Sequence, residues 1–85
     1  MNLSRGEQRV LHVLAQGGFI RHEHSSRTRI SRVDCVTRDG SLLSDCTLDV
    51  FMTLRRKRLV ASRDGGPYRI SRMGRGVVRP QADNR

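Results

Sequence analysis

Aromatic residues are scarce in this chain: it has no tryptophan, and Phe19, Phe51 and Tyr68 are the only phenylalanines and tyrosine. A buried core in 85 residues must therefore consist mainly of leucine, valine and isoleucine. No apolar run approaches the roughly 18 residues that a membrane span requires, and the first ten residues lack the apolar stretch of a signal peptide. We therefore expect one small cytoplasmic domain without membrane contact.

Metal-binding and catalytic residues are also few. Cys35 and Cys46 are the only cysteines, and two reduced thiols fit a cytoplasmic protein, with a disulfide or redox pair as the alternative. His22 and His24 could begin a zinc site with Cys35, but no CxxC or HxxxH spacing completes the four ligands. Cys46 could be an activated thiol near a helix start, yet no histidine is placed in sequence to serve it. We expect no metal, no cofactor and no enzymatic activity.

Negative charge is scarce as well. The chain has 17 basic and 8 acidic residues, a net charge of +9, and Lys57 is the only lysine among the basic ones. Residues 61–85 carry six basic and two acidic residues, and so contribute +4 of the excess. Such a charge attracts anionic partners, and guanidinium groups bind phosphate or carboxylate in a bidentate way. A GC-rich genome would enrich arginine too, so composition alone does not establish a binding site.

The first half of the chain predicts a helix and a β-hairpin. Ser4 and Glu7 have the spacing of a capping box, which predicts an amphipathic helix over residues 5–16. Residues 19–24 and 29–37 are rich in β-branched and aromatic side chains around a Ser-Ser-Arg-Thr turn, which predicts a hairpin. In its second strand, Ile30 and Val33 have opposite parity, so we expect a bulge or a late register.

The second half predicts a helix and a second hairpin. Ser44 is a suitable N-cap for a helix whose apolar face includes Leu48, Phe51 and Leu54. The segments LVAS and PYRIS then flank Arg-Asp-Gly-Gly, whose glycines permit the positive φ of a tight turn. The remaining segment has two glycines and a proline and predicts an irregular tail, in which Val77 and Val78 dock on the core.

We therefore predict an α+β fold with winged-helix character: helix, β-hairpin, helix and a second β-hairpin as the wing. Residues 1–79 would form the domain, and residues 80–85 a flexible tail. Ordinary winged helices place a helix where this chain has its first hairpin. The expected binding residues lie at the end of the second helix, in the wing and just after it; they are Arg55, Arg56, Lys57, Arg58, Arg63, Arg69, Arg72 and Arg75.

Four blocks of sequence resemble a known family from end to end. The segments NLSRGEQRVLHVLAQGG, LLSDCTLDVF, GGPYRISRMG and ADNR are similar, in this order, to the YjhX family of small bacterial proteins. The resemblance implies the toxin of a toxin–antitoxin pair, with inhibition of DNA topoisomerase I as its action. It also implies an acetyltransferase-like antitoxin, and it transfers no catalytic residues.

Other classes of function remain open at this point. The basic residues would serve duplex DNA through its phosphates or an acidic protein equally well, and a winged-helix transcriptional regulator is the alternative function. Base reading by the second helix is disfavoured because Asp45 and Asp49 near its start would repel a polyanion. Stacking on single strands is a weak reading, since Tyr68 is the only aromatic residue beside the basic run.

Overall fold

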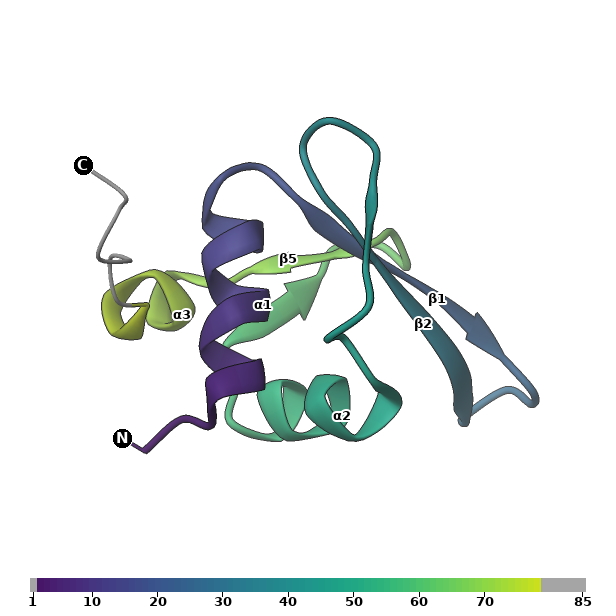
Figure 1. Cartoon of the computed structure of the whole chain (residues 1–85). Helices are drawn as coiled ribbons and strands as arrows, with labels where there is room; N and C mark the ends of the chain where they lie inside the picture. The colour runs from purple at the N-terminus through teal and green to yellow at the C-terminus, as the bar shows by residue number, and fades with distance from the viewer. Residues whose placement is uncertain (1, 79–85) are drawn as a thin grey trace.

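The computed structural model describes residues 2–78, which form an antiparallel sheet and three helices (Figure 1). In chain order the elements are α1 (Arg5–Ala15), β1 (Phe19–His24), β2 (Ile30–Val36), β3 (Leu42–Leu43), α2 (Leu48–Arg56), β4 (Val60–Ser62), β5 (Tyr68–Ile70) and α3 (Arg72–Val77). The five strands are arranged in the order β3-β2-β1-β5-β4, and all neighbours are antiparallel. The predicted α+β class is confirmed.

The capping box that predicts α1 is present. The backbone N–H of Ser4 donates to Glu7 Oε1 at 2.7 Å, and the N–H of Glu7 donates to Ser4 Oγ at 3.1 Å. The helix closes at Gly17, whose φ of 108° lies in a region that side chains disfavour. At Gly18 a Cβ would lie 2.7 Å from the carbonyl oxygen of Val36, so glycine is required for this close approach.

The β1–β2 hairpin contains the predicted bulge. The pairing register shifts between Glu23 and His24, where the chain passes from the Glu23–Arg32 pair to the His24–Ile30 pair. This shift restores the inward direction of Ile30, which joins the hydrophobic core. The hairpin projects beyond the helices in Figure 1.

The predicted start of α2 at Ser44 is wrong. The helix begins at Leu48, and Thr47 is its N-cap, with its hydroxyl oxygen accepting the N–H of Val50 at 3.2 Å. Leu42 and Leu43 pair with β2 as the short strand β3, which keeps the chain extended just before Ser44. Ser44 and Thr47 are both suitable N-cap residues, and the choice between them depends on the pairing of β3 with β2, which the local sequence does not show.

The core lies between α1, α2 and one face of the sheet. The helices contribute Phe51 and Leu54 from α2 and three residues of α1, while four strands contribute inward-facing residues. With Cys46 and Leu59 from the connecting segments, the set is Val10, Leu11, Leu14, Ile20, Ile30, Cys35, Cys46, Phe51, Leu54, Leu59, Val60 and Ile70. The strand residues in this core share one face of the sheet, because alternate residues of a strand point the same way and the bulge returns Ile30 to that face. Both helices therefore cover that face. In Figure 1, α1 crosses in front of β5.

The predicted second hairpin is confirmed as β4 and β5. Its turn has positive φ at both central residues, Asp64 (55°) and Gly65 (75°), and Gly66 N–H donates to the carbonyl of Arg63 at 3.0 Å. These features are those of a type I′ turn, for which Asp-Gly is a preferred pair because its twist matches that of the strands. The turn fixes where Arg63 lies relative to β5.

The structure corrects the prediction of an irregular tail. Residues Arg72–Val77 form α3, with Ser71 as N-cap accepting the N–H of Gly74 at 3.0 Å. The buried Gly74 lets this helix pack closely on β5 and on the segment before β4. Val77 and Val78 pack against the core as predicted. The predicted flexible tail, residues 80–85, lies outside the described residues.

Candidate anion-binding site

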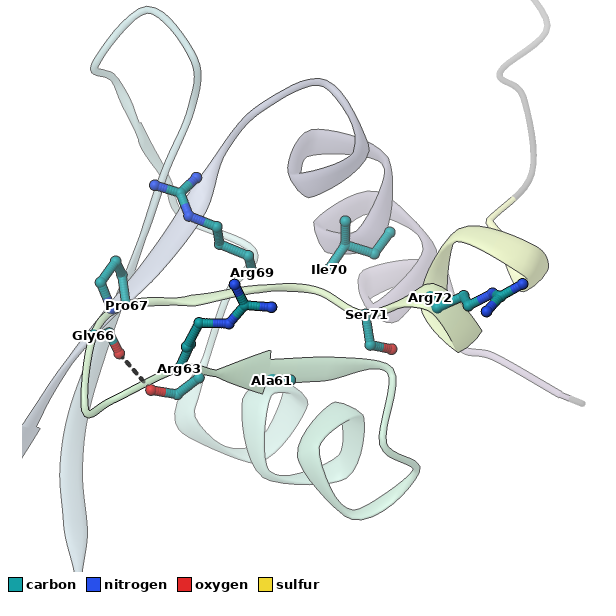
Figure 2. A pocket seen from close by; sticks show the side chains of 9 residues that line it. Ala61, Arg63, Gly66, Pro67, Arg69, Ile70, Ser71 and Arg72 are labelled. Atoms are coloured by element: carbon teal, nitrogen blue, oxygen red, sulfur yellow. Dashed lines mark hydrogen bonds between the residues drawn. The ribbon is translucent and has the colours of Figure 1, made fainter.

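A cavity of about 630 Å³ lies along the β4–β5 hairpin and ends at the start of α3 (Figure 2). Figure 2 views this hairpin from the face opposite the core, with the side chains of Arg63 and Arg69 on the near side and Arg72 at the far end. The lining residues are Ala61, Ser62, Arg63, Gly66, Pro67, Arg69, Ile70, Ser71 and Arg72. The volume falls within the range of pockets that hold small ligands.

Three arginines reach this cavity for separate local reasons. Arg63 opens the tight turn after β4. Arg69 points away from the core because its neighbours Tyr68 and Ile70 point inward, as the alternation of a strand requires. Arg72 is the first residue of α3, so the unpredicted helix sets its position. A turn, a strand and a helix start therefore gather three positive charges around one cavity.

The three arginines that line the cavity form no ion pair with a carboxylate of the described chain. Within residues 2–78, no carboxylate oxygen lies within 4.0 Å of a guanidinium nitrogen of Arg63, Arg69 or Arg72. Elsewhere in the described chain the ion pairs are Arg9–Asp45, Arg21–Asp34, Arg32–Asp34 and Lys57–Glu7. The three guanidinium groups outnumber Asp64, the carboxylate of the adjoining turn, so the potential at the cavity stays positive and attracts an external anion.

The other predicted binding residues lie elsewhere. The guanidinium carbon of Arg55 lies 6.0 Å from the centroid of the Tyr68 ring. Lys57 pairs with Glu7 and has only 25% of its side chain exposed. Arg56, Arg58 and Arg75 are exposed but do not line the cavity. Of the eight predicted residues, the cavity brings together Arg63, Arg69 and Arg72.

Phe19 is a neighbour of the cavity that the sequence did not reveal. The guanidinium carbon of Arg69 lies 5.4 Å from the centroid of the Phe19 ring. The pairing of Ile20 with Tyr68 brings these two residues side by side on adjacent strands. Tyr68, the aromatic residue beside the basic run in the sequence, packs at the edge of the core against Phe51, with 4.9 Å between the ring centroids. A pairing of strands distant in sequence cannot be read from local patterns.

His22 lies on the core side of β1, next to Tyr68 and His24. Its ring centroid is 5.1 Å from that of Tyr68 and 5.2 Å from that of His24, and its Nδ1 is buried without a hydrogen-bond partner in the described part of the chain. Burial, assisted by the positive charges of His24 and Arg55, lowers the pKa of His22. Among residues 2–78, no group of three His, Cys, Asp or Glu side chains could hold a metal ion.

The two cysteines are buried and not bridged to each other. A hydrogen bond with Cys35, together with burial, raises the pKa of the Cys46 thiol well above its ordinary value. Cys46 directly precedes Thr47, the N-cap of α2, and therefore lies outside the helix. Both thiols belong to the hydrophobic core.

The ion pair between Glu7 and Lys57 stabilises the base of α1. Lys57 Nζ lies 3.4 Å from Glu7 Oε1 and donates to the carbonyl of Asn2 at 3.1 Å. Burial raises the pKa of Glu7, but the hydrogen bonds from Ser4 and Lys57 outweigh it, so the pKa lies below its ordinary value of 4.5. Because the folded pKa is depressed, this stabilisation is complete above pH 4.5 and is lost as the pH falls through the folded pKa.

We therefore expect Glu7→Gln to lower the free energy of unfolding at pH 7 by about 1–3 kcal/mol, since Lys57 loses its charged partner. The deficit relative to the wild type should shrink as the pH falls below 4.5. Urea unfolding followed by circular dichroism at several pH values measures both quantities. An unchanged deficit across this range would contradict a role for the carboxylate charge.

Among the described residues, no helix is long and apolar enough to cross a membrane. The fold and its cavity define a small α+β domain that presents unpaired arginines on one side of a hairpin. The chain belongs to the YjhX toxin family: the family model, described as "Putative toxin of bacterial toxin-antitoxin pair", matches residues 1–85. This membership gives it the general role of a toxin whose partner is an antitoxin.

Curated relatives support the family assignment. A UPF0386 protein of Beijerinckia indica is 62% identical over 85 residues and covers all of both chains. A UPF0386 protein of Brucella anthropi is also 62% identical with full coverage of both, and one of Rhodospirillum rubrum is 61% identical over 99% of this chain and 93% of its own. No solved structure matches this chain.

Proposed function

We propose that this toxin acts by binding an anionic site and not by catalysis. The observation that carries the proposal is the convergence of Arg63, Arg69 and Arg72 on one cavity without carboxylate partners among the described residues. Guanidinium groups around a cavity recognise phosphate or carboxylate groups through charge-assisted, bidentate hydrogen bonds. The buried Cys46, with its raised pKa, is unsuited to nucleophilic catalysis.

The target we propose is DNA topoisomerase I, through its DNA or through an acidic part of the enzyme. The resemblance to the family implies this enzyme, and the cavity supplies the chemistry that either target requires. A bound toxin would occupy the phosphates that the topoisomerase must contact, or the basic surface would compete for an acidic part of the enzyme. Either target places the toxin in the cytoplasm.

If the domain contacts DNA as winged-helix domains do, the β4–β5 hairpin suits this contact better than α2 does. In that mode, the β4–β5 hairpin is the wing, and its arginines contact phosphates. The exposed Asp49 at the first turn of α2 would oppose base reading by that helix. We therefore place DNA contact at the wing, and a sequence-specific transcriptional regulator remains the less favoured function.

The antitoxin partner completes the proposed system. An acetyltransferase-like antitoxin, which the resemblance implies, would neutralise the toxin most directly by covering the same arginines with acidic side chains. Binding of this kind is steered by charge and weakened by salt. Antitoxin and nucleic acid would then exclude each other from the arginines of the toxin.

A plasmid relaxation assay tests the proposed function. We expect purified toxin to inhibit relaxation by DNA topoisomerase I in proportion to its concentration. Excess linear duplex DNA should relieve the inhibition if the toxin acts on the DNA, and should leave it unchanged if the toxin binds the enzyme. Intact masses of enzyme and toxin after the reaction should be unaltered. A covalent change in either protein would contradict a mechanism by binding. Full inhibition at a molar ratio of toxin to enzyme far below one would contradict it as well.

A further inference from the structure

We infer that the sheet face beside the cavity binds single-stranded nucleic acid, with phosphates at Arg63, Arg69 and Arg72 and a base stacked at Phe19. The inference rests on the proposed function because it uses the same arginines. It adds that the ligand is an unpaired strand, which neither the charge nor the cavity alone specifies.

A continuous row of side chains crosses this face. Ala61 pairs with Arg69, Arg69 lies against Phe19, Phe19 pairs with Val36, and Val36 pairs with Leu42. All five have the parity opposite to the residues that contact α1 and α2. Leu42 is 61% exposed, and Ala61 and Arg69 are exposed as well. Phe19 is half-buried and Val36 is buried, so the row is closed between Phe19 and Leu42. The accessible part, which begins at the cavity and consists of Ala61, Arg69 and the Phe19 ring, is the platform.

The chemistry of this platform suits an unpaired nucleotide. A base can stack on the outer side of the Arg69 guanidinium, or on the Phe19 ring itself once Arg69 turns to a phosphate. Every base has an apolar face, so such stacking tolerates many sequences. A duplex keeps its bases stacked on each other and would offer the platform only its phosphates. The ring beside the arginines therefore gives an unpaired strand an additional favourable contact.

The distribution of charge limits the length of the bound segment. Around the cavity, the three arginines have no carboxylate partner in the described chain. Farther along the same face, Arg21 and Arg32 share Asp34 at 3.7 and 3.9 Å. The carboxylates on β1 and β2 would repel phosphates there. We therefore place the strand over β4, β5 and the start of β1, a site for a few nucleotides.

Fluorescence anisotropy with short oligonucleotides of about 12 nucleotides tests this inference. We expect the wild type to bind a labelled single strand more tightly than a duplex of equal length. Phe19→Leu keeps an apolar side chain but removes the ring, and should weaken single-strand binding roughly 5- to 150-fold, the value of one stacked base. Phe19→Tyr should restore it. Binding of an abasic oligonucleotide of the same length should be equal for all three proteins.

The outcomes separate the inference from the proposed function. Equal affinity of wild type and Phe19→Leu for the single strand would overturn the stacking site, while loss of binding in an Arg63→Ala/Arg69→Ala/Arg72→Ala variant would still support the anion site. If that triple variant binds every oligonucleotide like the wild type, both proposals fail. Tight binding of polyglutamate, with no binding of either oligonucleotide, would assign the cavity to an acidic protein and contradict the inference.

Discussion

Simultaneous replacement of Arg63, Arg69 and Arg72 by alanine is expected to abolish growth inhibition when the protein is expressed from an inducible promoter in bacteria. These are the arginines of the cavity, and each guanidinium contact with a phosphate or carboxylate is worth about 1.5–3 kcal/mol. Loss of all three would weaken binding by several orders of magnitude. Colony counts with and without inducer measure the effect.

A matched control separates the site from the net charge. Arg27, Arg29 and Arg38 are exposed and lie away from the cavity, so their replacement by alanine removes the same charge. We expect this variant to inhibit growth like the wild type when immunoblots show equal amounts of protein. Equal loss of toxicity in both triple variants would attribute the effect to overall charge, and retained toxicity in the cavity variant would remove the cavity from the mechanism.

Gly74→Ala is expected to lower the free energy of unfolding by about 2–4 kcal/mol. A Cβ at this buried position would overlap the carbonyl oxygen of Leu59 and lie 2.8 Å from a side-chain carbon of Ile70. The same carbonyl accepts the N–H of Ser71 at 2.9 Å, so it cannot move without loss of that hydrogen bond. The helix α3 must then shift away from the sheet, and Arg72 shifts with it.

Gly76 provides the control, because it lies in the same helix and a Cβ there would meet no atom within 4 Å. Gly76→Ala should leave stability unchanged or raise it by up to about 1 kcal/mol, through the better helix propensity of alanine. Urea unfolding of both variants measures the difference. Similar stabilities for the two variants would contradict the close packing of α3 described here.

Local patterns were sufficient for most of the fold. The Ser4–Glu7 capping box, the bulge in the first hairpin and the Asp-Gly turn of the second are encoded within a few residues of each other, and each is present. The start of α2 and the existence of α3 were mispredicted for a common reason. The strand β3 exists only because β2 lies beside it, and α3 has two glycines whose cost is offset by packing against β5.

The site was predictable only in part. The sequence identified the basic segment, but could not tell that Lys57 pairs with Glu7 across the α1–α2 contact. It could not show that Arg55 lies near Tyr68, on the side of the sheet opposite Arg69. Phe19 was not recognised because its contact with Arg69 depends on the pairing of β1 with β5. Each of these features joins residues that are distant in the sequence.

The most direct test of the account is the salt dependence of binding to a single-stranded oligonucleotide, compared between the wild type and the two triple variants. Three phosphate contacts predict a slope of log K against log salt near −2, at about −0.7 per contact. We predict that the cavity variant has a nearly flat response, whereas the Arg27, Arg29 and Arg38 variant keeps the wild-type slope. Equal slopes for the wild type and the cavity variant would contradict the assignment of Arg63, Arg69 and Arg72 as the anion-binding residues.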